Sequence, residues 1–244
     1  MLSRMDNTPP CNRTRAEAGA GDGFDHVQDW IFDLDNTLYR ADNGIFAQID
    51  GRMTAFVAGL LGVERDAARQ VQKQLYRDHG TTLAGLIAVH KIDPEPYLDF
   101  VHDIDLSELR PDPQLIDALA RLPGRRFVFT NGCRNHALRI LERLKLADMF
   151  DQVWDIRTID FIPKPARAAY DAVVRRGGVT ASRAAMFDDI ARNLVVPHEL
   201  GMTTVWLDGE SDWSRQGPEF PVASKAHIDH ETRDLCSFLN SLGI

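Results

Sequence analysis

The chain has 244 residues, of which 44% are hydrophobic and 26% are charged, and its formal net charge is -8. A chain of this length and composition can bury a sizeable core, as one domain with a large insertion or as two domains. The acidic balance argues against a general nucleic-acid or membrane-surface binder, because both need basic patches. No apolar stretch reaches the roughly 18 to 20 residues of a membrane span, and a secretory hydrophobic core is lacking.

Residues 1–23 show no apolar periodicity and mix prolines and glycines with charged residues. This composition predicts a disordered lead-in, within which Met5 is an alternative start to Met1. The three cysteines are widely scattered and form no CxxC pair of the kind used in zinc or redox sites. We therefore expect a soluble, cytoplasmic protein, because thiols stay reduced in that compartment.

A short apolar run, Val27–Phe32, predicts the first strand, and apolar residues at helical spacing follow it. Breaks at Gly62, Gly80 and Pro94 divide the following region into four helices. They are predicted at Ile45–Leu61, Glu64–His79, Thr82–His90 and Glu95–His102. This part of the chain is therefore a helical insertion after the first strand.

From Pro111 onward, predicted helices and strands alternate. The helices are Pro113–Leu122, Asn135–Leu144, Ala166–Arg176 and Ala191–Leu200, and the strands are Arg126–Thr130, Gln152–Ile156, Ala184–Asp188 and Thr203–Leu207. Such alternation implies right-handed crossovers and a mostly parallel sheet covered on both faces. We predict an α/β fold with a Rossmann-like parallel sheet and an inserted α-helical domain.

Two acidic residues, Asp33 and Asp35, directly follow the first strand. Alternate side chains of a strand face the same side, so both can reach the carboxyl edge of the sheet, where open α/β sheets bind ligands. One acid could then be a nucleophile or metal ligand and the other a proton donor. An ordinary acidic turn, with Asn36 and Thr37 as turn residues, explains this pair equally well.

Polar residues also follow later strands. Thr130 and Asn131 precede Gly132, whose backbone can approach a ligand, although an ordinary helix N-cap is as good an explanation. Lys164 lies between two prolines, and such a fixed cation suits a cluster of acids and phosphate oxygens. Cys133 lies beside the same loop and is interpreted as structural.

A second acidic pair, Asp188 and Asp189, ends a later strand, and Asn193 lies about one helical turn beyond it. Helix capping by Asp189 is the ordinary explanation, and it leaves Asp188 without a role. Taken together, the motifs DxDxT, TNG, KP and DDxxxN occur in the order that resembles the haloacid dehalogenase (HAD) superfamily of phosphohydrolases. The resemblance spans about residues 25–242.

The resemblance implies a role for each of these residues. Asp33 would be the nucleophile, Asp35 the general acid/base, Thr130 and Asn131 the phosphate-binding residues and Lys164 the cation that steadies the phosphate. Asp33, Asp35 and Asp188 would hold Mg²⁺, with Asp189 and Asn193 as outer partners. Mg²⁺ and the lysine would screen the repulsion between a carboxylate and a dianionic ester, which allows an aspartyl-phosphate to form. True dehalogenases of this superfamily lack the second acid, so phosphoryl transfer is favoured.

The helical insertion, residues 41–110, resembles the cap domain of this superfamily, and residues 24–40 and 111–244 form the predicted core. Several stretches of the chain, such as Asp33–Tyr39 and His79–Leu83, resemble the pyrimidine 5'-nucleotidase branch. Arg40 and Ala84 depart from its pattern. The expected activity is Mg²⁺-dependent hydrolysis of a small phosphate monoester, with UMP and CMP as leading substrates. The alternatives are another small ester, such as pyridoxal phosphate or phosphoglycolate, a phosphomutase, or a non-catalytic binding scaffold, which would have lost a core acid.

Four aromatic or hydroxyl residues are candidate substrate contacts, namely Tyr39, Tyr76, Thr81 and Thr82. For Thr81 and Thr82, N-capping of the following helix is at least as good an explanation as substrate contact. Tyr76 is as readily explained by packing, and the histidines of the insertion, including His102, are expected at the surface.

Overall fold

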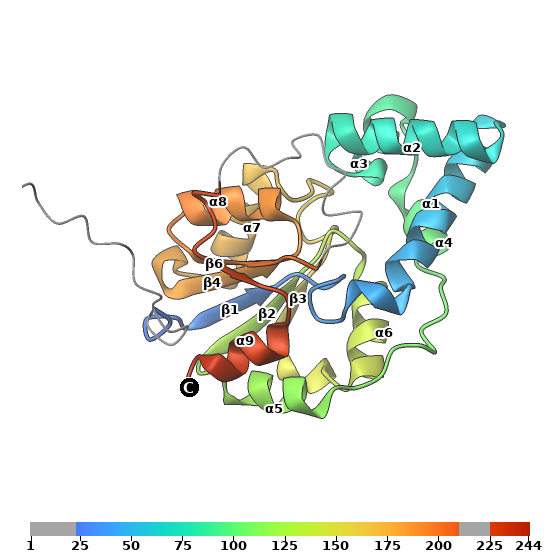
Figure 1. The fold of residues 1–244 in the computed structure, drawn as a ribbon. Helices are drawn as coiled ribbons and strands as arrows, with labels where there is room; N and C mark the ends of the chain where they lie inside the picture. Colours follow the sequence, from blue (N-terminus) through green and yellow to red (C-terminus); the bar gives the residue numbers. More distant parts are fainter. Residues whose placement is uncertain (1–22, 210–224) are drawn as a thin grey trace, which may run out of the picture.

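The computed structural model describes residues 23–209 and 225–244, and at its centre is a parallel sheet (Figure 1). Its strands are β1 (Asp29–Phe32), β2 (Arg125–Phe129), β3 (Gln152–Trp154), β4 (Ala184–Asp188), β5 (Thr203–Leu207) and β6 (His230–Thr232). They lie in the order β3-β2-β1-β4-β5-β6, and every neighbouring pair is parallel. The predicted α/β fold with a parallel sheet is confirmed.

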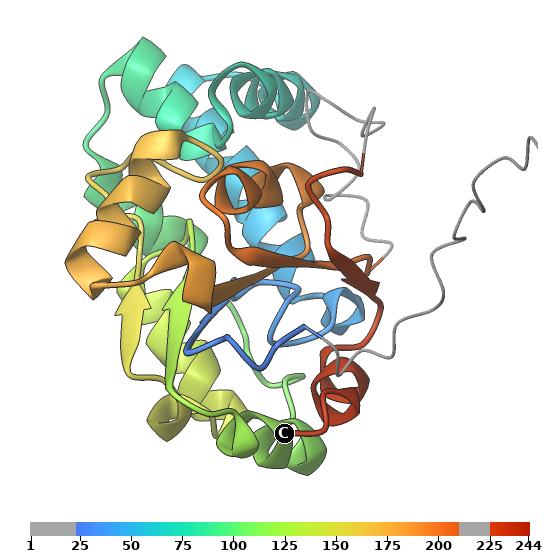
Figure 2. The ribbon, with the colours of Figure 1, turned by 90° about the vertical axis from the view of Figure 1, so that its left-hand side faces the viewer.

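Helices cover both faces of this sheet because side chains along each strand alternate between the faces (Figure 2). In β1, Trp30 and Phe32 pack on one face and Ile31 on the other. The first face is covered by α5 (Pro113–Arg121), α6 (Arg134–Leu144) and α9 (Leu235–Ser241), and the second by α7 (Arg167–Gly177) and α8 (Val195–Glu199). The central strand is therefore buried on both sides, and its carboxyl end is held rigidly.

The insertion consists of helices that pack on one another beside the sheet (Figure 1). They are α1 (Ile45–Leu61), α2 (Arg65–His79), α3 (Thr82–His90) and α4 (Pro94–Val101), preceded by the 3₁₀ helix η1 (Ala41–Asn43). Gly62 ends α1 in the left-handed region, φ 63°, and Asp93 caps α4 by accepting a hydrogen bond from Glu95 N at 3.0 Å. These helices lie within the predicted cap segment 41–110. None of the described helices is long and apolar enough to cross a membrane.

The observed elements differ from the predicted ones in a few places. The third strand was predicted to reach Ile156 but ends at Trp154, because the Asp155 carboxylate accepts hydrogen bonds from Thr158 and turns the chain. The predicted helix Ala191–Leu200 is divided into η4 (Ala191–Leu194) and α8. β6, α9 and three 3₁₀ helices, η1, η2 (Ala147–Met149) and η3 (Ala181–Arg183), had not been predicted. Except for its last residue, the predicted lead-in 1–23 lies outside the described residues.

Candidate active site

The carboxyl ends of three neighbouring strands bring the predicted acids together. Phe32 of β1 is paired in register with Val128 of β2 and Phe187 of β4, so the residues that follow these strands meet at one edge. Asp33 follows the central strand, which lies between the other two. After it the chain turns sharply at Asn36, which has a left-handed φ of 63°, a conformation that asparagine tolerates better than most residues.

Lys164 is buried at the centre of this edge and uses its ammonium group to join three strands. Its Nζ donates to Asp33 Oδ1 at 2.6 Å, to Asp188 Oδ2 at 2.7 Å and to the carbonyl oxygen of Phe129 at 2.9 Å. Burial alone would lower the pKa of Lys164, but the charges of Asp188 and Asp33 raise it above its usual value. The lysine therefore stays charged.

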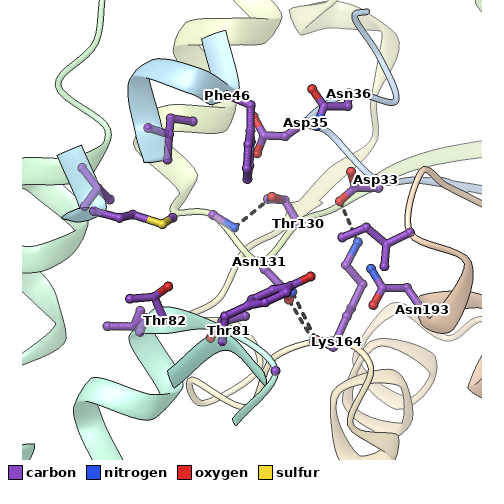
Figure 3. Close-up of a pocket in the computed structure, with 18 of the residues that line it drawn as sticks. Asp33, Asp35, Asn36, Phe46, Thr81, Thr82, Thr130, Asn131, Lys164 and Asn193 are labelled. Carbon is purple, nitrogen blue, oxygen red and sulfur yellow. Dashed lines mark hydrogen bonds and ion pairs between the residues drawn. The ribbon is translucent and has the colours of Figure 1, made fainter. Parts of the chain in front are cut away.

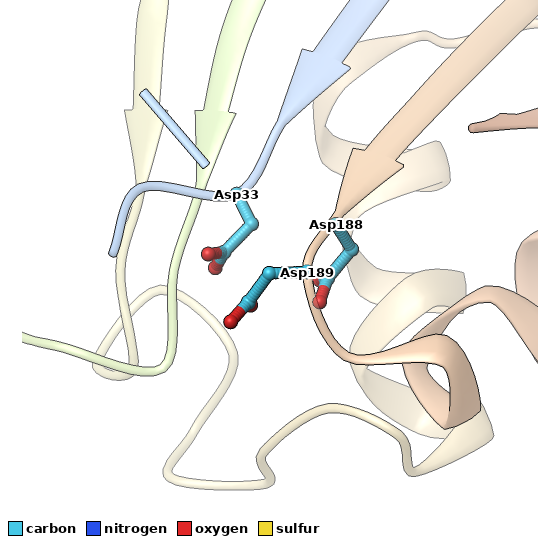
Figure 4. A group of neighbouring side chains, drawn as sticks. All are labelled: Asp33, Asp188 and Asp189. Carbon is cyan, nitrogen blue, oxygen red and sulfur yellow. The ribbon is translucent and has the colours of Figure 1, made fainter. Parts of the chain in front are cut away.

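Three buried carboxylates, those of Asp33, Asp188 and Asp189, form a group in which one oxygen of each lies within 4.8 Å of the others (Figure 4). Burial raises the pKa of Asp33 to about 7, with Asp188 and Asp35 adding to the effect and Lys164 opposing it. Burial, followed by the charges of Asp33 and Asp188, also raises the pKa of Asp189 well above its usual value. Ionising three buried carboxylates beside a single ammonium group is unfavourable, and a hard divalent cation such as Mg²⁺, which these oxygen donors fit, would offset their charge.

The predicted outer partners occupy two different places. Asn193 contacts the carboxylate group through Asp188, because its Nδ2 donates to Asp188 Oδ1 at 2.9 Å, the oxygen that also accepts from Ile190 N. Asp189 belongs to the carboxylate group itself, and its Oδ2 accepts a hydrogen bond from Asn36 Nδ2 at 3.4 Å. The Asp35 carboxylate, which had been predicted as part of the metal site, lies outside this group of described residues.

The predicted phosphate-binding residues close the edge beside β2. Thr130 is buried, and its Oγ1 accepts a hydrogen bond from Gly132 N at 2.9 Å. Asn131 holds the Lys164 backbone at both ends, accepting from its N–H at 2.8 Å and donating to its carbonyl oxygen at 3.2 Å. This loop and the lysine loop are therefore fixed to each other.

Asp35 is held by two donors that sequence reasoning did not connect to it. Tyr39 OH donates to Asp35 Oδ1 at 2.6 Å, and His136 Nε2 lies 2.9 Å from the same oxygen. Burial opposes ionisation of Asp35, but His136 and Tyr39 together lower its pKa below the usual value. The resting site therefore favours the ionised form of Asp35, in which it can act as a base.

A cavity of about 140 Å³ lies between this sheet edge and the cap (Figure 3). The core side is lined by Asp33, Asp35 and Asp189 together with Thr130, Asn131 and Lys164, and Thr81 and Thr82 lie across from them on the cap side. Much of the cap wall is apolar, with Phe46, Ile49, Met53, Leu83, Leu98 and Val101. The charged groups therefore face the cavity mainly from the core.

The four candidate cap contacts have different surroundings. Thr82 is buried and lines the cavity, whereas the Thr81 side chain, although it also lines the cavity, caps α3 by accepting from Ala84 N at 3.0 Å. Tyr76 lines the cavity with one face of its ring covered by the Arg192 guanidinium, 4.7 Å from the ring centroid. Tyr39 is not one of the residues that line the cavity.

Two buried polar clusters had not been predicted. In the cap, Asp50 of α1 accepts from Gln72 Nε2 at 2.5 Å and Arg69 Nη1 at 2.9 Å, and Lys73 lies 3.6 Å from it. Gln72 and Lys73 line the cavity. The only available signal was the presence of an acid among the apolar residues of a helix.

The second unpredicted cluster is a pair of stacked histidines. The rings of His102 and His136 lie 4.3 Å apart with 21° between their planes. The prediction that His102 lies at the surface is wrong, because the end of α4 turns it into the core, where burial lowers its pKa to about 3. Cys133, interpreted as structural, is buried with its Sγ 3.3 Å from His102 Nδ1.

A parallel sheet with an acid-lined carboxyl edge and a helical insertion closing over it defines a capped α/β enzyme. A profile of haloacid dehalogenase-like hydrolases matches residues 31–195, and the protein belongs to this hydrolase family. It is 30% identical over 190 residues to phosphate metabolism protein 8 of Saccharomyces cerevisiae, an alignment that covers 71% of this chain and 59% of that protein. The chain thus spans less than two thirds of the length of this relative.

Solved structures show the same fold. A predicted phosphoglycolate phosphatase from Haemophilus somnus has a TM-score of 0.61 at 16% identity, over 89% of this chain and 99% of that one. The putative HAD-hydrolase YfnB from Bacillus subtilis, bound to magnesium, has a TM-score of 0.56 at 15% identity, over 89% and 99% of the two chains. At these identities the likeness establishes the fold, and the chemistry has to be argued from the site.

Proposed function

We propose that the protein is a Mg²⁺-dependent phosphatase that hydrolyses small phosphate monoesters through an aspartyl-phosphate on Asp33. The observation that carries this proposal is the group of three buried carboxylates held against Lys164, since Nζ lies 2.6 Å from Asp33 and 2.7 Å from Asp188. A fixed cation beside a carboxylate that faces a cavity is what attack on an anionic ester requires. Membership of a hydrolase family supports the same chemistry.

Asp33, Asp188 and Asp189 would hold the metal, which would supply charge screening for the dianionic ester. Asp33 is the carboxylate next to both the cavity and Lys164, so it is placed to attack phosphorus. Thr130 and the Asn131 N–H would donate to the phosphoryl oxygens as negative charge develops on them. The loss of one such oriented donor typically raises the barrier by about 3 to 4 kcal/mol.

Asp35 would protonate the leaving oxygen and then remove a proton from the attacking water. It lines the cavity two residues beyond the nucleophile, so one ester can contact both acids. The resting site favours its ionised form, which suits the second step. A dianionic ester bound beside Asp35 would oppose that ionisation, because a like charge disfavours the charged form.

For the substrate, we propose pyrimidine 5'-nucleotides such as UMP and CMP. A cavity of about 140 Å³ with a largely apolar cap wall favours the flat face of a single ring. Common ligand pockets are larger, at roughly 300 to 1,000 Å³. Tyr76 and Thr82 form part of that wall, and Thr82 belongs to the stretch His79–Leu83 that resembles the nucleotidase branch.

The test is a hydrolysis screen over UMP, CMP, AMP, GMP, pyridoxal phosphate and phosphoglycolate, with Mg²⁺ and with EDTA. We expect Mg²⁺-dependent release of phosphate, with a higher kcat/KM for UMP and CMP than for the purine nucleotides. A preference for purine nucleotides, for pyridoxal phosphate or for phosphoglycolate would refute the pyrimidine nucleotidase assignment. The assignment as a phosphatase would still hold. Activity that survives EDTA would show that the reaction needs no metal. A product in which the phosphate has moved to another position of the substrate would indicate a phosphomutase.

A further inference from the structure

The two hydrogen bonds to Asp35 end on the same oxygen. Tyr39 OH lies 2.6 Å from Oδ1, and His136 Nε2 lies 2.9 Å from Oδ1. His136 Nε2 can bond to this carboxylate oxygen only by donating to it, so Nε2 is assigned as the nitrogen that carries a proton. Among the described residues, none donates to the other oxygen, Oδ2.

Both donors reach Asp35 from the protein interior, on the side away from the cavity. Asp35 lines the cavity, whereas neither Tyr39 nor His136 does. The side chain of His136 is fully buried and that of Asp35 is 14% exposed. The oxygen that accepts both bonds is therefore engaged by the protein interior, and Oδ2 is the oxygen left for a substrate.

We propose that Tyr39 and His136 are positioning residues that engage Asp35 Oδ1 and thereby reserve Oδ2 for proton transfer to the leaving group. This inference rests on the proposed phosphatase function. Rotation of the Asp35 carboxyl group by half a turn would exchange its two oxygens. Two donors fixed on one side oppose that rotation, because it would place a protonated oxygen, itself a donor, against them.

The His136 ring is itself held by packing. It stacks on His102, whose Nδ1 lies 2.9 Å from the carbonyl oxygen of Leu98 in the cap helix α4. Gly132 leaves room for the ring, since a Cβ there would lie 3.3 Å from His136 Cδ2 and 3.5 Å from His102 Nε2. His136 Nδ1 has no hydrogen-bond partner among the described residues, so the ring, fixed by this packing, directs its hydrogen bond from Nε2 to Asp35.

The proton balance of the two steps is simple. In the first step, the proton on Asp35 Oδ2 passes to the leaving oxygen as its bond to phosphorus breaks and the bond from Asp33 forms. In the second step, water attacks the phosphorus of the aspartyl-phosphate, gives one proton to Oδ2 and releases phosphate and the Asp33 carboxylate. Oδ1 keeps its two hydrogen bonds throughout.

The experiment compares Tyr39→Phe, His136→Leu and His136→Gln with the parent, using Mg²⁺ and phosphate esters of graded leaving-group basicity. The readout is kcat/KM, because it reports the first phosphoryl transfer. We expect Tyr39→Phe and His136→Leu to lose about 10-fold or more with an alkyl phosphate and little with 4-nitrophenyl phosphate, since a good leaving group needs little protonation. His136→Gln, which keeps an N–H donor, should retain most of the parent activity with the alkyl ester.

Asp35→Asn is the reference background. Adding Tyr39→Phe or His136→Leu to it should change the leaving-group dependence no further, because the group they position has gone. Equal losses of kcat/KM across all esters, or a further loss in the Asp35→Asn background, would overturn the inference. Neither result would contradict the proposed phosphatase function. A folded parent that cleaves none of the esters with Mg²⁺ would overturn the proposed function and this inference with it. Tyr39→Phe removes a single oxygen, so it keeps the test decisive if His136→Leu fails to fold.

Discussion

The sheet edge and the cap wall enclose the same cavity but use their charges in opposite ways. At the sheet edge, Asp33, Asp189 and Lys164 line the cavity, and the Lys164 ammonium, 2.6 Å from Asp33, offsets only part of the carboxylate charge. In the cap, the buried Asp50 does not line the cavity, and its partners Arg69 and Gln72 tie α1 to α2. The core thus presents most of the charge that faces a ligand, whereas the cap uses its buried Asp50 to hold its own helices together, and Lys73 is the cap cation that also lines the cavity.

This difference separates two tasks. A phosphate group is the same in every ester, so a fixed set of charges at the sheet edge can handle all of them. A mainly apolar cap wall distinguishes esters by the shape of what is attached to the phosphate, and shape discrimination in apolar pockets is modest, at about 10- to 200-fold per methylene-sized difference. We therefore expect variants of the edge to affect every substrate and variants of the wall to affect only some.

The largest expected effect is that of Asp33→Asn. The change removes the nucleophile at nearly constant volume, and we expect loss of activity with every ester by about 10⁴-fold or more, the scale found when one member of a catalytic unit is removed. The loss is measured as steady-state hydrolysis of 4-nitrophenyl phosphate. The matched control is Asp99→Asn, the same substitution at an exposed residue of the cap. Near-normal turnover of a sugar phosphate by Asp33→Asn would rule out the covalent route.

The next effect concerns the metal. Asp188→Ala should weaken Mg²⁺ activation more than Asp189→Ala, because Asp188 also contacts Lys164 at 2.7 Å and Asn193 at 2.9 Å. Asn193→Ala should raise the Mg²⁺ concentration for half-activation by about 10- to 100-fold, as is typical when a partner of a ligand is lost. Mg²⁺ titrations of activity decide the order, and the reverse order for the two aspartates would exchange their roles.

A smaller effect separates two neighbouring threonines of the cap. Thr82→Val should lower nucleotide cleavage by about 3- to 10-fold, the range for one lost hydrogen bond, and spare a small aryl phosphate. Thr81→Val should cost about 1 kcal/mol of stability through the lost cap of α3 and affect both substrates alike. The kcat/KM ratio of the two substrates and the melting temperature distinguish them. Equal substrate losses in Thr82→Val would mean that this hydroxyl does not contact the nucleotide.

The smallest expected effect on activity comes from Asp155, whose contribution is to stability and depends on pH. Burial alone would raise the pKa of Asp155, but hydrogen bonds from Thr158 and the Arg134 N–H hold it below its usual value. A lowered pKa stabilises the folded state above the ordinary pKa of about 4, and this stability is lost as the pH falls through the folded value. Asp155→Asn should therefore lower the free energy of unfolding by about 1 to 2 kcal/mol at pH 7 and by less below pH 4. Urea unfolding at both pH values is the measurement, and an equal difference at both would contradict the assignment.

Sequence reasoning worked best where spacing along the chain determines position in space. Strand ends of a parallel sheet meet at one edge, so Asp33, Thr130 and Asp188 could be grouped before any geometry was known. The position of Asp189 was harder to predict. In a loop that follows a strand, the sequence does not determine which of two adjacent carboxylates points toward Asp33. The C-terminal helix α9 had a readable signal, a capping Asp234 before apolar residues at helical spacing, which was overlooked.

The remaining contacts depend on pairings that no local pattern encodes. His136 and Asp35 are 101 residues apart, and their contact follows from the packing of α6 against the loop after β1. His102 reaches the same place from the end of α4. The hydrogen bonds of Asp50 likewise require α1 and α2 to be docked in one register. β6 has only polar residues with partly exposed side chains, so it carries no apolar alternation.

The central place of β1 also has a consequence for the order of folding. This strand leaves the ribosome first among the six, yet its two partners are β2, which starts at Arg125, and β4, which starts at Ala184. The cap helices contact one another over short sequence separations, so they can form during synthesis, long before the sheet closes. We expect the strand that carries Asp33 to gain its last neighbour only when most of the chain has been made, and nascent chains that end before β4 to have a formed cap and no catalytic centre.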